Sequence, residues 1–454
     1  MRINRKNRNH LICNNTFTDL IMIFIASACI CSIFISFFLF SHIPISENHN
    51  LNLDHDRKEN HNLNLEKNKN QENSNKSKAQ VEIIPLIDDE NLSFENRIRN
   101  AAEFAFTSFL NHCQNSDEIR PISGQCLNLY GFYSSIVESL ESLYLLNLTK
   151  LYKTAKSIIS QNFKCQSFTQ NINHDELMNR GIASLIGTYL VTRDKSFLKL
   201  AENCMHLIFE IEQKYYFPRP IINFQTKEGY DREWENGTSI HDIVSGLPEI
   251  LSLYKITKKQ IFLDYSKKLV SKLLKSNKQC IFFDSMTGVN KSDVEMNNNA
   301  FKSYFDILNM CDSLKIESIN IKQLLSEQFS QTKFYQDQYD PILRIIDEDI
   351  SYYSRRASTN DNFEFEAKYV RNLLLNNRDK NEITEIFRTI FNKTKSGNGF
   401  SGISFSNKNN QRKIDIQPSS FFGDWLNTAA HLLKENSSFW NESVFNVRGH
   451  LLSF

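Results

Sequence analysis

The sequence predicts an all-α protein in which one transmembrane helix and a disordered stalk precede a large helical array or toroid. Three observations predict this organisation. An uncharged apolar run covers residues 20–40, a polar low-complexity stretch covers 46–80, and helical apolar periodicity begins near Leu92 and continues along the chain. Of the 454 residues, 41% are hydrophobic and 35 are phenylalanine, so the chain can build a sizeable core.

The first 40 residues predict a type II signal anchor. The run LIMIFIASACICSIFISFFLF, residues 20–40, has no charge and is long enough for a bilayer, which needs about 20 apolar residues. Four basic residues precede it, so the positive-inside rule keeps residues 1–19 cytosolic and sends the remaining chain across the membrane. A cleaved signal peptide is the alternative, although its apolar core is usually shorter, about 7–15 residues.

Residues 41–91 predict a disordered polar stalk. The unit ENHNLNL occurs at 47–53 and again at 59–65, within a stretch rich in Asn, Lys and Glu. Because such a segment has no apolar face to bury, it cannot offset the entropy of ordering its backbone.

Residues 92–454 predict one helical domain, since no second linker interrupts them and strand-like alternation is rare. Paired helices with short connections favour an array or toroid. The predicted helices cover residues 93–112, 134–147, 150–161, 177–192, 195–213, 240–256, 259–275, 300–314, 318–330, 364–377, 380–394 and 420–434.

Composition and motifs narrow the possible functions. Lys+Arg 53 against Asp+Glu 52 gives a net charge of +1, which argues against a nucleic-acid partner. The sequence has no Walker A, GxSxG, HExxH or GxGxxG motif. What remains are carboxylates at helix starts, and glycoside hydrolysis needs one carboxyl group as acid and another as base.

Nine cysteines are present, and six of them lie beyond the predicted membrane segment. An even number in an oxidising lumen makes some disulfide pairing plausible, but the pairing is not readable from the sequence. None has the CxxC spacing of a zinc site. The six are Cys113, Cys126, Cys165, Cys204, Cys280 and Cys311.

Seven segments, in order, resemble the motifs of class I α-1,2-mannosidases (glycoside hydrolase family 47). The segment DEIRPISG…GFYSSIVESLESLYLLNL, residues 117–148, resembles DELRPLS…ATIVDALDTLYIMGL, and INHDELMNRGIASLIGTYLVTRD, 172–194, resembles FETNIRxxGGLLSAYYLTGD. The remaining five are TSIHDIVSGLPEILSLYKIT, AFKSYFDIL, FEFEAKYVRNLLLNNRD, SSFFGDWLNTAAHLL and VFNVRGH. The resemblance implies an (α/α)7 barrel over 92–454 and inverting removal of α-1,2-linked mannose from high-mannose N-glycans, with calcium as cofactor, in the ER or Golgi.

The resemblance also assigns site residues. Glu176 matches the general acid, Arg180 a substrate-binding arginine, and Glu366 the base. Asp242 and Glu249 lie in a matching segment and are candidate substrate-binding acids. The structural alternatives are a helix N-terminal acid at Glu176, an ion pair at Arg180 and a solvated helix acid at Glu366.

Three departures from the family pattern predict weakened chemistry. Lys302 stands where the family has an acidic residue, and Arg448 follows the calcium position in place of a glutamate. Val447 replaces the calcium-binding threonine, so it can offer the metal only its backbone carbonyl. A catalytically inactive protein that binds glycans or misfolded glycoproteins in ER quality control is therefore the alternative function. A helical toroid with neither sugar nor metal is a third.

Overall fold

The computed structural model places its described residues in one compact unit, Gln80–Phe454. The predicted span 20–40 and most of the predicted stalk 41–91 lie outside the described residues. Within the described ranges, no helix is long and apolar enough to cross a membrane. The structure describes residues 82–87, 92–232, 237–276, 282–291, 298–323, 362–363, 365, 367, 370–371, 373, 380–407 and 410–453.

The compact unit begins before the predicted boundary at residue 92. Residues 82–87 run along α3 (Phe94–Cys113), because the backbone N–H groups of Ile84 and Ile87 donate to the side chains of Thr107 and Asn100. The last part of the predicted stalk is therefore attached to the first helix.

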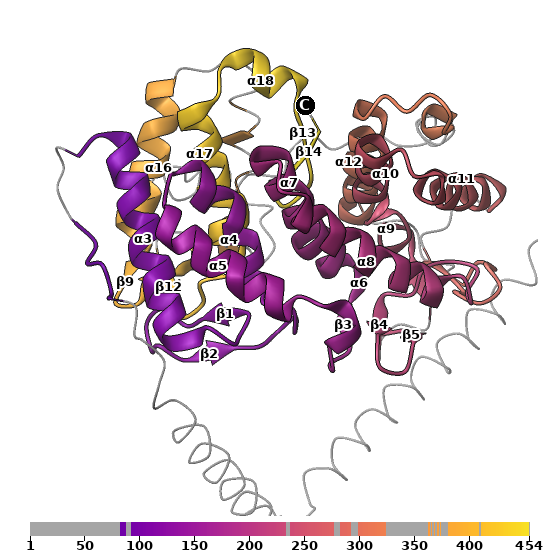
Figure 1. Cartoon of the computed structure of the whole chain (residues 1–454), viewed down its shortest axis with the longest axis horizontal. Coiled ribbons are helices and arrows are strands. Elements are labelled where there is room, and N and C mark those ends of the chain that lie inside the picture. The colour runs from indigo at the N-terminus through magenta and orange to yellow at the C-terminus, as the bar shows by residue number, and fades with distance from the viewer. Residues whose placement is uncertain are drawn as a thin grey trace, which may run out of the picture. The chain divides into compact units, whose positions relative to one another are not determined.

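The described part of the chain is predominantly helical, as predicted, and its helices form an inner and an outer layer (Figure 1). The inner helices α4 (Ser134–Leu145), α7 (Ala183–Thr192) and α10 (Leu247–Thr257) pack side by side, and α17 (Asn427–Lys434) packs against α4. Every residue of α4 from Ser134 to Leu143 is buried. A helix covered on all sides belongs in the interior of a large domain.

The outer helices bury only one face each. Helices α5 (Thr149–Asn162), α8 (Lys195–Glu212) and α11 (Gln260–Lys275) each pack on the inner helix that precedes them in the chain. In α5 the buried residues are Leu151, Ala155, Ile158 and Ile159, which recur at helical spacing. The remaining described helices are α12 (Asn298–Ser313), which packs against α9 and α10, α16 (Lys380–Thr394) and α18 (Ser437–Glu442).

Three predicted helices are interrupted where the structure builds its centre. The helix predicted at 177–192 begins earlier, as α6 (His174–Glu176), and continues through a π-helical turn, η2 (Leu177–Ile182), into α7. A second π-helical turn, η3 (Phe421–Leu426), precedes α17. The helix predicted at 240–256 is divided into α9 (Ile240–Val244) and α10, because Pro248 lacks the N–H that a continuous helix would use. π-Helical turns inside α-helices often occur at functional sites.

Short antiparallel strands join the helices. Most have two or three residues, and the longest pair, β11 with β12, follows α16 in a region for which the sequence predicted no strand. The pairs are β1 (Glu118–Ile119) with β2 (Cys126–Leu127), β3 (Ile172–Asn173) with β4 (Ile221–Asn223) and β5 (Glu228–Tyr230), β6 (Thr238–Ser239) with β7 (Phe282–Phe283), β8 (Asn362–Phe363) with β11 (Gly402–Asn407) and β12 (Asn410–Ile414), β9 (Lys395–Ser396) with β10 (Gly399–Phe400), and β13 (Val444–Phe445) with β14 (Leu451–Ser453).

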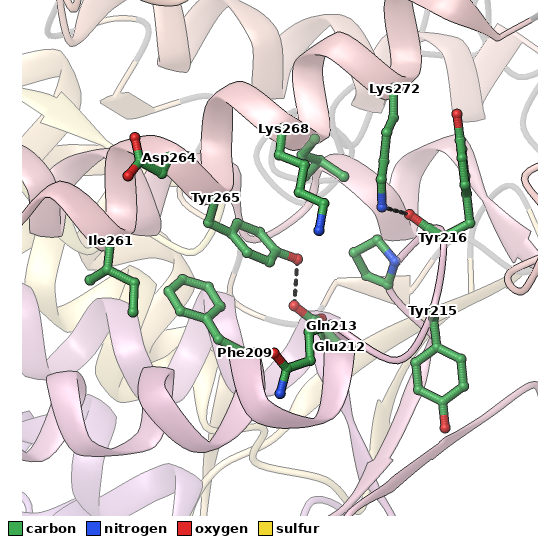
Figure 2. Close-up of a pocket in the computed structure, with 12 residues that line it drawn as sticks. Phe209, Glu212, Gln213, Tyr215, Tyr216, Ile261, Asp264, Tyr265, Lys268 and Lys272 are labelled. Carbon is green, nitrogen blue, oxygen red and sulfur yellow. Dashed lines mark hydrogen bonds between the residues drawn. The ribbon is translucent and has the colours of Figure 1, made fainter.

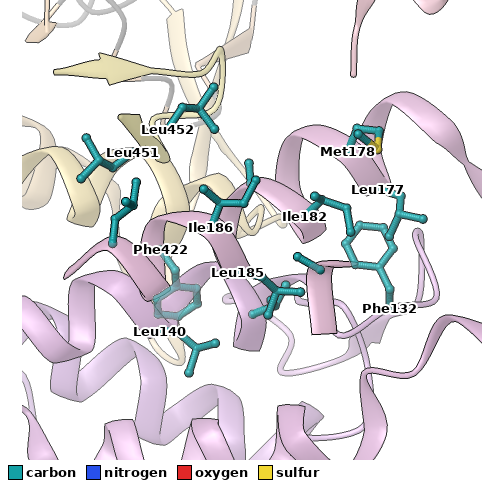
Figure 3. Packing of buried hydrophobic residues seen from close by; sticks show 14 of the residues in the cluster. Phe132, Leu140, Leu177, Met178, Ile182, Leu185, Ile186, Phe422, Leu451 and Leu452 are labelled. Atoms are coloured by element: carbon teal, nitrogen blue, oxygen red, sulfur yellow. The ribbon is translucent and has the colours of Figure 1, made fainter. Parts of the chain in front are cut away.

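Strand β14 lies against the inner helices and completes the core. Leu451 and Leu452 are fully buried, and β14 contacts α7 and α10. Figure 3 shows these leucines close to Ile186 of α7 and above Phe422 of η3. The hairpin β13–β14 therefore carries its connecting turn, residues 446–450, into the centre of the helical layers.

Two disulfides fasten the outer parts of the fold. Cys113 pairs with Cys126, which joins the end of α3 to β2, and Cys165 pairs with Cys204, which joins the turn η1 (Cys165–Ser167) to α8. Cys311 is a buried free thiol, and Cys280 lies outside the described residues. The structure thus supplies a pairing that the sequence left open.

Candidate functional site

Arg180 organises a cluster of charged side chains at the centre of the helical layers. It lies in the π-helical turn η2 and is 4% exposed. Its Nη1 donates to Glu138 Oε1 at 3.2 Å and to Ser419 Oγ at 2.9 Å, and its Nε donates to Glu176 Oε2. The guanidinium also lies 5.1 Å from the ring centre of Tyr130. One arginine thus joins α4, α6 and the segment before η3.

Glu176, the candidate acid, lies between two arginines. Nε of Arg180 donates to Glu176 Oε2, and Nη2 of Arg448 lies 3.2 Å from Glu176 Oε1. The side chains of Glu176 and Arg448 are 17% and 22% exposed, more than the Arg180 side chain at 5%. Glu176 therefore keeps contact with solvent, but both carboxylate oxygens already accept from guanidinium groups.

Arg448 is positioned by the turn between β13 and β14. Asn446 Oδ1 accepts from the backbone N–H groups of Arg448 and His450, both at 3.0 Å. Asn446 Nδ2 donates to the carbonyl of Asn179 at 2.8 Å and to Glu249 Oε1 at 3.0 Å. This one amide side chain shapes the turn and ties it to both η2 and α10.

Two glutamates and two histidines form a fully buried cluster, which contacts Arg180 through Glu138. His450 Nε2 lies 3.5 Å from Glu138 Oε2, its Nδ1 lies 3.5 Å from Glu141 Oε2, and His431 Nε2 lies 2.8 Å from Glu141 Oε1. Burial opposes ionisation of Glu138, but Arg180 and then His450 outweigh it and lower the pKa of Glu138. Burial likewise opposes ionisation of Glu141, but His431 and His450 lower its pKa.

The same buried cluster favours a protonated His450. Burial alone would lower the pKa of His450, but its contacts with Glu138 and Glu141 raise it. Glycines make room for the two carboxylates, since a Cβ on Gly423 would lie 2.2 Å from Glu138 Oε2 and one on Gly187 would lie 2.3 Å from Glu141 Oε2. The lack of a side chain at Gly187 of α7 and at Gly423 of η3 therefore leaves room for the two carboxylates.

Two further buried acids have raised pKa values. Burial raises the pKa of Glu249 to about 8, and its Oε2 has no hydrogen-bond partner among the described residues. Burial also raises the pKa of Glu118 to about 7, although its Oε1 accepts from the backbone N–H of Ser419 at 2.8 Å. Each could hold a proton near neutral pH, which a group that donates to a substrate requires.

Asp242, a predicted substrate-binding residue, is 1% exposed and is engaged by neighbours. Arg232 donates to its two oxygens at 2.8 and 2.6 Å, and Ser239 Oγ donates at 2.6 Å. Asp242 also completes a capping box with Ser239 at the start of α9. In this structure it serves as an ion-pair partner and a helix cap.

The structure brings some of the predicted site residues together and does not describe others. Glu176, Arg180 and Glu249 come together around the β13–β14 turn, but Glu366 lies outside the described residues. Lys302 lies in α12, and nothing is described of its side chain. Asp175 was missed by sequence reasoning: burial opposes its ionisation, but His241, 3.6 Å away, lowers the pKa of Asp175 to about 2. His431 and His450 were also missed: His431 is a lone histidine in an apolar helix, and His450 ends the segment VFNVRGH, whose resemblance was read for calcium and not for this histidine.

The residues near Val447 do not fit a calcium ion. Calcium takes about 6–8 oxygen ligands. The Val447 side chain packs against the core and carries no oxygen, and the guanidinium of Arg448 is the next side chain along the turn. Across the described ranges, no group of three or more His, Cys, Asp or Glu side chains is arranged to hold a metal.

Comparisons with known proteins point to one family. The sequence model of glycosyl hydrolase family 47 matches residues 101–379. The mannosyl-oligosaccharide 1,2-α-mannosidase mans-2 of Caenorhabditis elegans is 24% identical over 199 residues, 42% of this chain and 34% of that protein. The endoplasmic reticulum mannosyl-oligosaccharide 1,2-α-mannosidase of Mus musculus is 23% identical over 142 residues, 31% of this chain and 21% of that protein. The chain thus spans about a third or less of these relatives.

A solved structure agrees with the helical architecture. The α-1,2-mannosidase from Trichoderma reesei superposes with a TM-score of 0.58 at 14% sequence identity. The match covers 79% of this chain and 98% of that one. At this identity the likeness concerns the fold alone.

Proposed function

The chain belongs to glycosyl hydrolase family 47, and from that premise we propose that it is an α-1,2-mannosidase-like hydrolase that trims high-mannose N-glycans in the secretory pathway. The observation that carries the proposal is the pair Glu176 and Arg180, which match the family's acid and substrate-binding arginine and lie in contact in the central cluster. We propose that the domain 92–454 forms the (α/α)7 barrel of the family around them.

In this proposal Glu176 protonates the glycosidic oxygen and Glu366 activates a water on the opposite face of the sugar. Inverting enzymes keep two such carboxyl groups about 6.5–9.5 Å apart to admit that water. Arg180 orients the substrate, and Glu249 and Asp242 are proposed to contribute to the sugar site. Glu249 suits a role as hydrogen-bond donor, because burial raises its pKa to about 8.

The proposed location is the lumen of the ER or Golgi, with residues 20–40 as a type II anchor and 1–19 in the cytosol. Residues 41–91 are proposed as a tether whose last part, 82–87, lies along α3. The disulfides Cys113–Cys126 and Cys165–Cys204 support an oxidising compartment, because such bonds persist in secretory proteins and are rare in the cytosol. The matched relatives include endoplasmic reticulum mannosidases.

The direct test is mannose release by the full chain from a labelled high-mannose oligosaccharide, with and without added calcium. Glu176→Gln should reduce release by about 100-fold or more, because a positioned general acid contributes roughly 10²–10⁴ in rate. Glu210→Gln is the matched control, since Glu210 is an exposed partner of Lys227 on α8. Oligosaccharide binding without any release would overturn the hydrolase and favour the inactive glycan-binding protein.

A second variant tests the contact between Arg448 and Glu176. Arg448→Gln keeps a hydrogen-bond donor but removes the positive charge that lies 3.2 Å from Glu176 Oε1. We expect kcat for mannose release to rise, because the glycosidase transition state is itself cationic and Glu176 must hold a proton to act. An unchanged or lower kcat would show that Arg448 does not limit the reaction.

A further inference from the structure

A pocket separate from the central cluster lies between the end of α8 and the outer face of α11. Its volume is about 400 Å3, near the lower end of the range of about 300–1,000 Å3 that small-molecule sites occupy. Neither Glu176 nor Arg180 lines it. Figure 2 shows residues of both helices at the pocket: Phe209 and Glu212 from α8 contact Tyr265 of α11, and Lys268 comes from the same helix as Tyr265.

Aromatic rings form part of the pocket wall. Phe209 and Tyr265 stack with ring centres 4.2 Å apart and planes 17° apart, so they make one rigid aromatic surface. Tyr216 lies across the pocket, where Lys272 donates to its carbonyl and lies 4.7 Å from its ring centre. These contacts hold the rings in place before any ligand binds, so little side-chain entropy is lost on binding.

The floor of the pocket holds a buried carboxyl group with an unsatisfied oxygen. Glu212 is 5% exposed, and the hydroxyl of Tyr265 donates to its Oε2. His174 Nε2 is 3.1 Å from Oε1, but the two atoms are not aligned for a hydrogen bond, so Oε1 has no such partner among the described residues. Leaving a buried polar atom unpaired is costly. Among the described residues only Tyr265 donates a hydrogen bond to this carboxyl group, so a ligand hydroxyl in the pocket could supply a further one.

The charges around the pocket are balanced. Two acids, Glu212 and Asp264, and two lysines, Lys268 and Lys272, are among the lining residues. In Figure 2 the ammonium of Lys268 points towards the hydroxyl of Tyr265. This balance disfavours a strongly charged ligand. It suits a neutral molecule that has many hydroxyl groups, because these can accept from lysine and donate to glutamate.

We propose that this pocket binds one neutral pyranose residue, with the C–H groups of the sugar against the Phe209–Tyr265 surface and its hydroxyls on Glu212 and Lys268. A pyranose has apolar patches on its ring faces and hydroxyls around its edge, which matches an aromatic wall beside a polar floor. The inference goes beyond the proposed hydrolase, because it concerns a second sugar site on the outer layer.

The test is ligand-observed saturation-transfer NMR on the full chain with methyl α-D-mannopyranoside and methyl α-D-glucopyranoside, and with sodium sulfate as an anionic competitor. Glu212→Leu removes the acceptor and Lys268→Met removes a donor at an exposed position. Each should weaken pyranoside binding by about fivefold or more, the value of roughly one hydrogen bond. Lys268→Met is exposed and should fold normally, so it keeps the test valid if Glu212→Leu does not fold.

The central variant Glu176→Gln separates the two sites. Pyranoside binding should survive Glu176→Gln, whether or not that variant releases mannose. Loss of pyranoside binding and loss of mannose release are therefore separate results, one testing the outer pocket and the other the hydrolase. Loss of binding in Glu176→Gln would overturn the inference by assigning the signal to the central cluster. Unchanged binding in Lys268→Met and Glu212→Leu, no binding to the wild type, or displacement by sulfate would also overturn it.

Discussion

The glutamates of α4 and the glutamate of α10 are equally buried, and yet their pKa values are shifted in opposite directions. Glu138 and Glu141 are 0% and 1% exposed, and Glu249 is 0% exposed. The pKa values of the α4 pair are lowered, whereas that of Glu249 is raised to about 8. The difference comes from the partners. Arg180, His450 and His431 face the α4 pair, but a neutral amide, Asn446, faces Glu249.

The comparison shows that burial alone does not decide ionisation at the centre of this fold. Opposite charge within a few ångströms favours the ionised form and desolvation favours the neutral form, so each carboxyl group follows whichever effect is larger. The centre thus holds carboxyl groups on α4 whose ionised form is favoured and a carboxyl group on α10 that can carry a proton near neutral pH. Acid–base chemistry needs both kinds of group.

The largest expected effect on stability comes from removing Arg180, the cation that favours the ionised form of Glu138 on α4. Arg180→Met should lower the free energy of unfolding by about 3–5 kcal/mol, because it leaves Glu138 and Glu176 without their shared partner in a buried setting. Urea titration followed by circular dichroism measures the change. A loss below about 1 kcal/mol would mean that Glu138 is protonated in the native state, which would break the comparison.

The α10 side is tested through pH. Below its unfolded pKa of 4.5, Glu249 is protonated in both states; between 4.5 and about 8 only the folded state keeps the proton, so stability falls as pH rises. Glu249→Gln removes this loss. The variant should gain about 1.4 kcal/mol relative to wild type for each pH unit across that window.

The measurement is the urea unfolding free energy of both proteins at several pH values between the two pKa values. Parallel stability curves for wild type and Glu249→Gln would show that Glu249 is ionised in the folded protein, as the α4 glutamates are. A gain that stops well below pH 8 would place the pKa of Glu249 lower than its burial indicates.

The smallest effect on stability is expected for an ion pair at the surface, because water there weakens the attraction between the two charges. Arg388 and Glu385 form a pair three residues apart on α16, with side chains 42% and 62% exposed. Arg388→Met should change the unfolding free energy by about 0.5 kcal/mol or less. It is the matched control for Arg180→Met in the same urea titration. A loss comparable to that of Arg180→Met would indicate that the Met substitution itself, rather than burial of the partner carboxylates, causes the damage.

Much of the helical architecture could be predicted from the sequence. The predicted helix at 380–394 has the bounds of α16, and those at 195–213 and 259–275 differ from α8 and α11 by one residue at one end. These helices have one apolar stripe, so periodicity locates them. The division at Gly246 follows from Pro248 and could have been predicted, whereas the π-helical turns could not, because Arg180 and Asp424 lie where tertiary contacts set the local backbone.

The site was less predictable than the fold. Motif resemblance selected Glu176, Arg180 and Glu249, and the structure brings these three around one turn. It could not indicate that Arg448 would contact Glu176, since the two residues are 272 positions apart. Glu118, His431 and His450 take part only through contacts that the fold creates. The prediction for Glu366 remains a prediction.

The insertion of β14 has a consequence for synthesis of the chain. Ser184 contacts His450, which is translated 266 residues later. At about 5–20 residues per second, roughly 15 to 50 seconds separate the two. Until the hairpin has been made, the apolar faces of α7 and, once it is synthesised, α10 lack the strand that covers them, so the nascent protein should depend on chaperones.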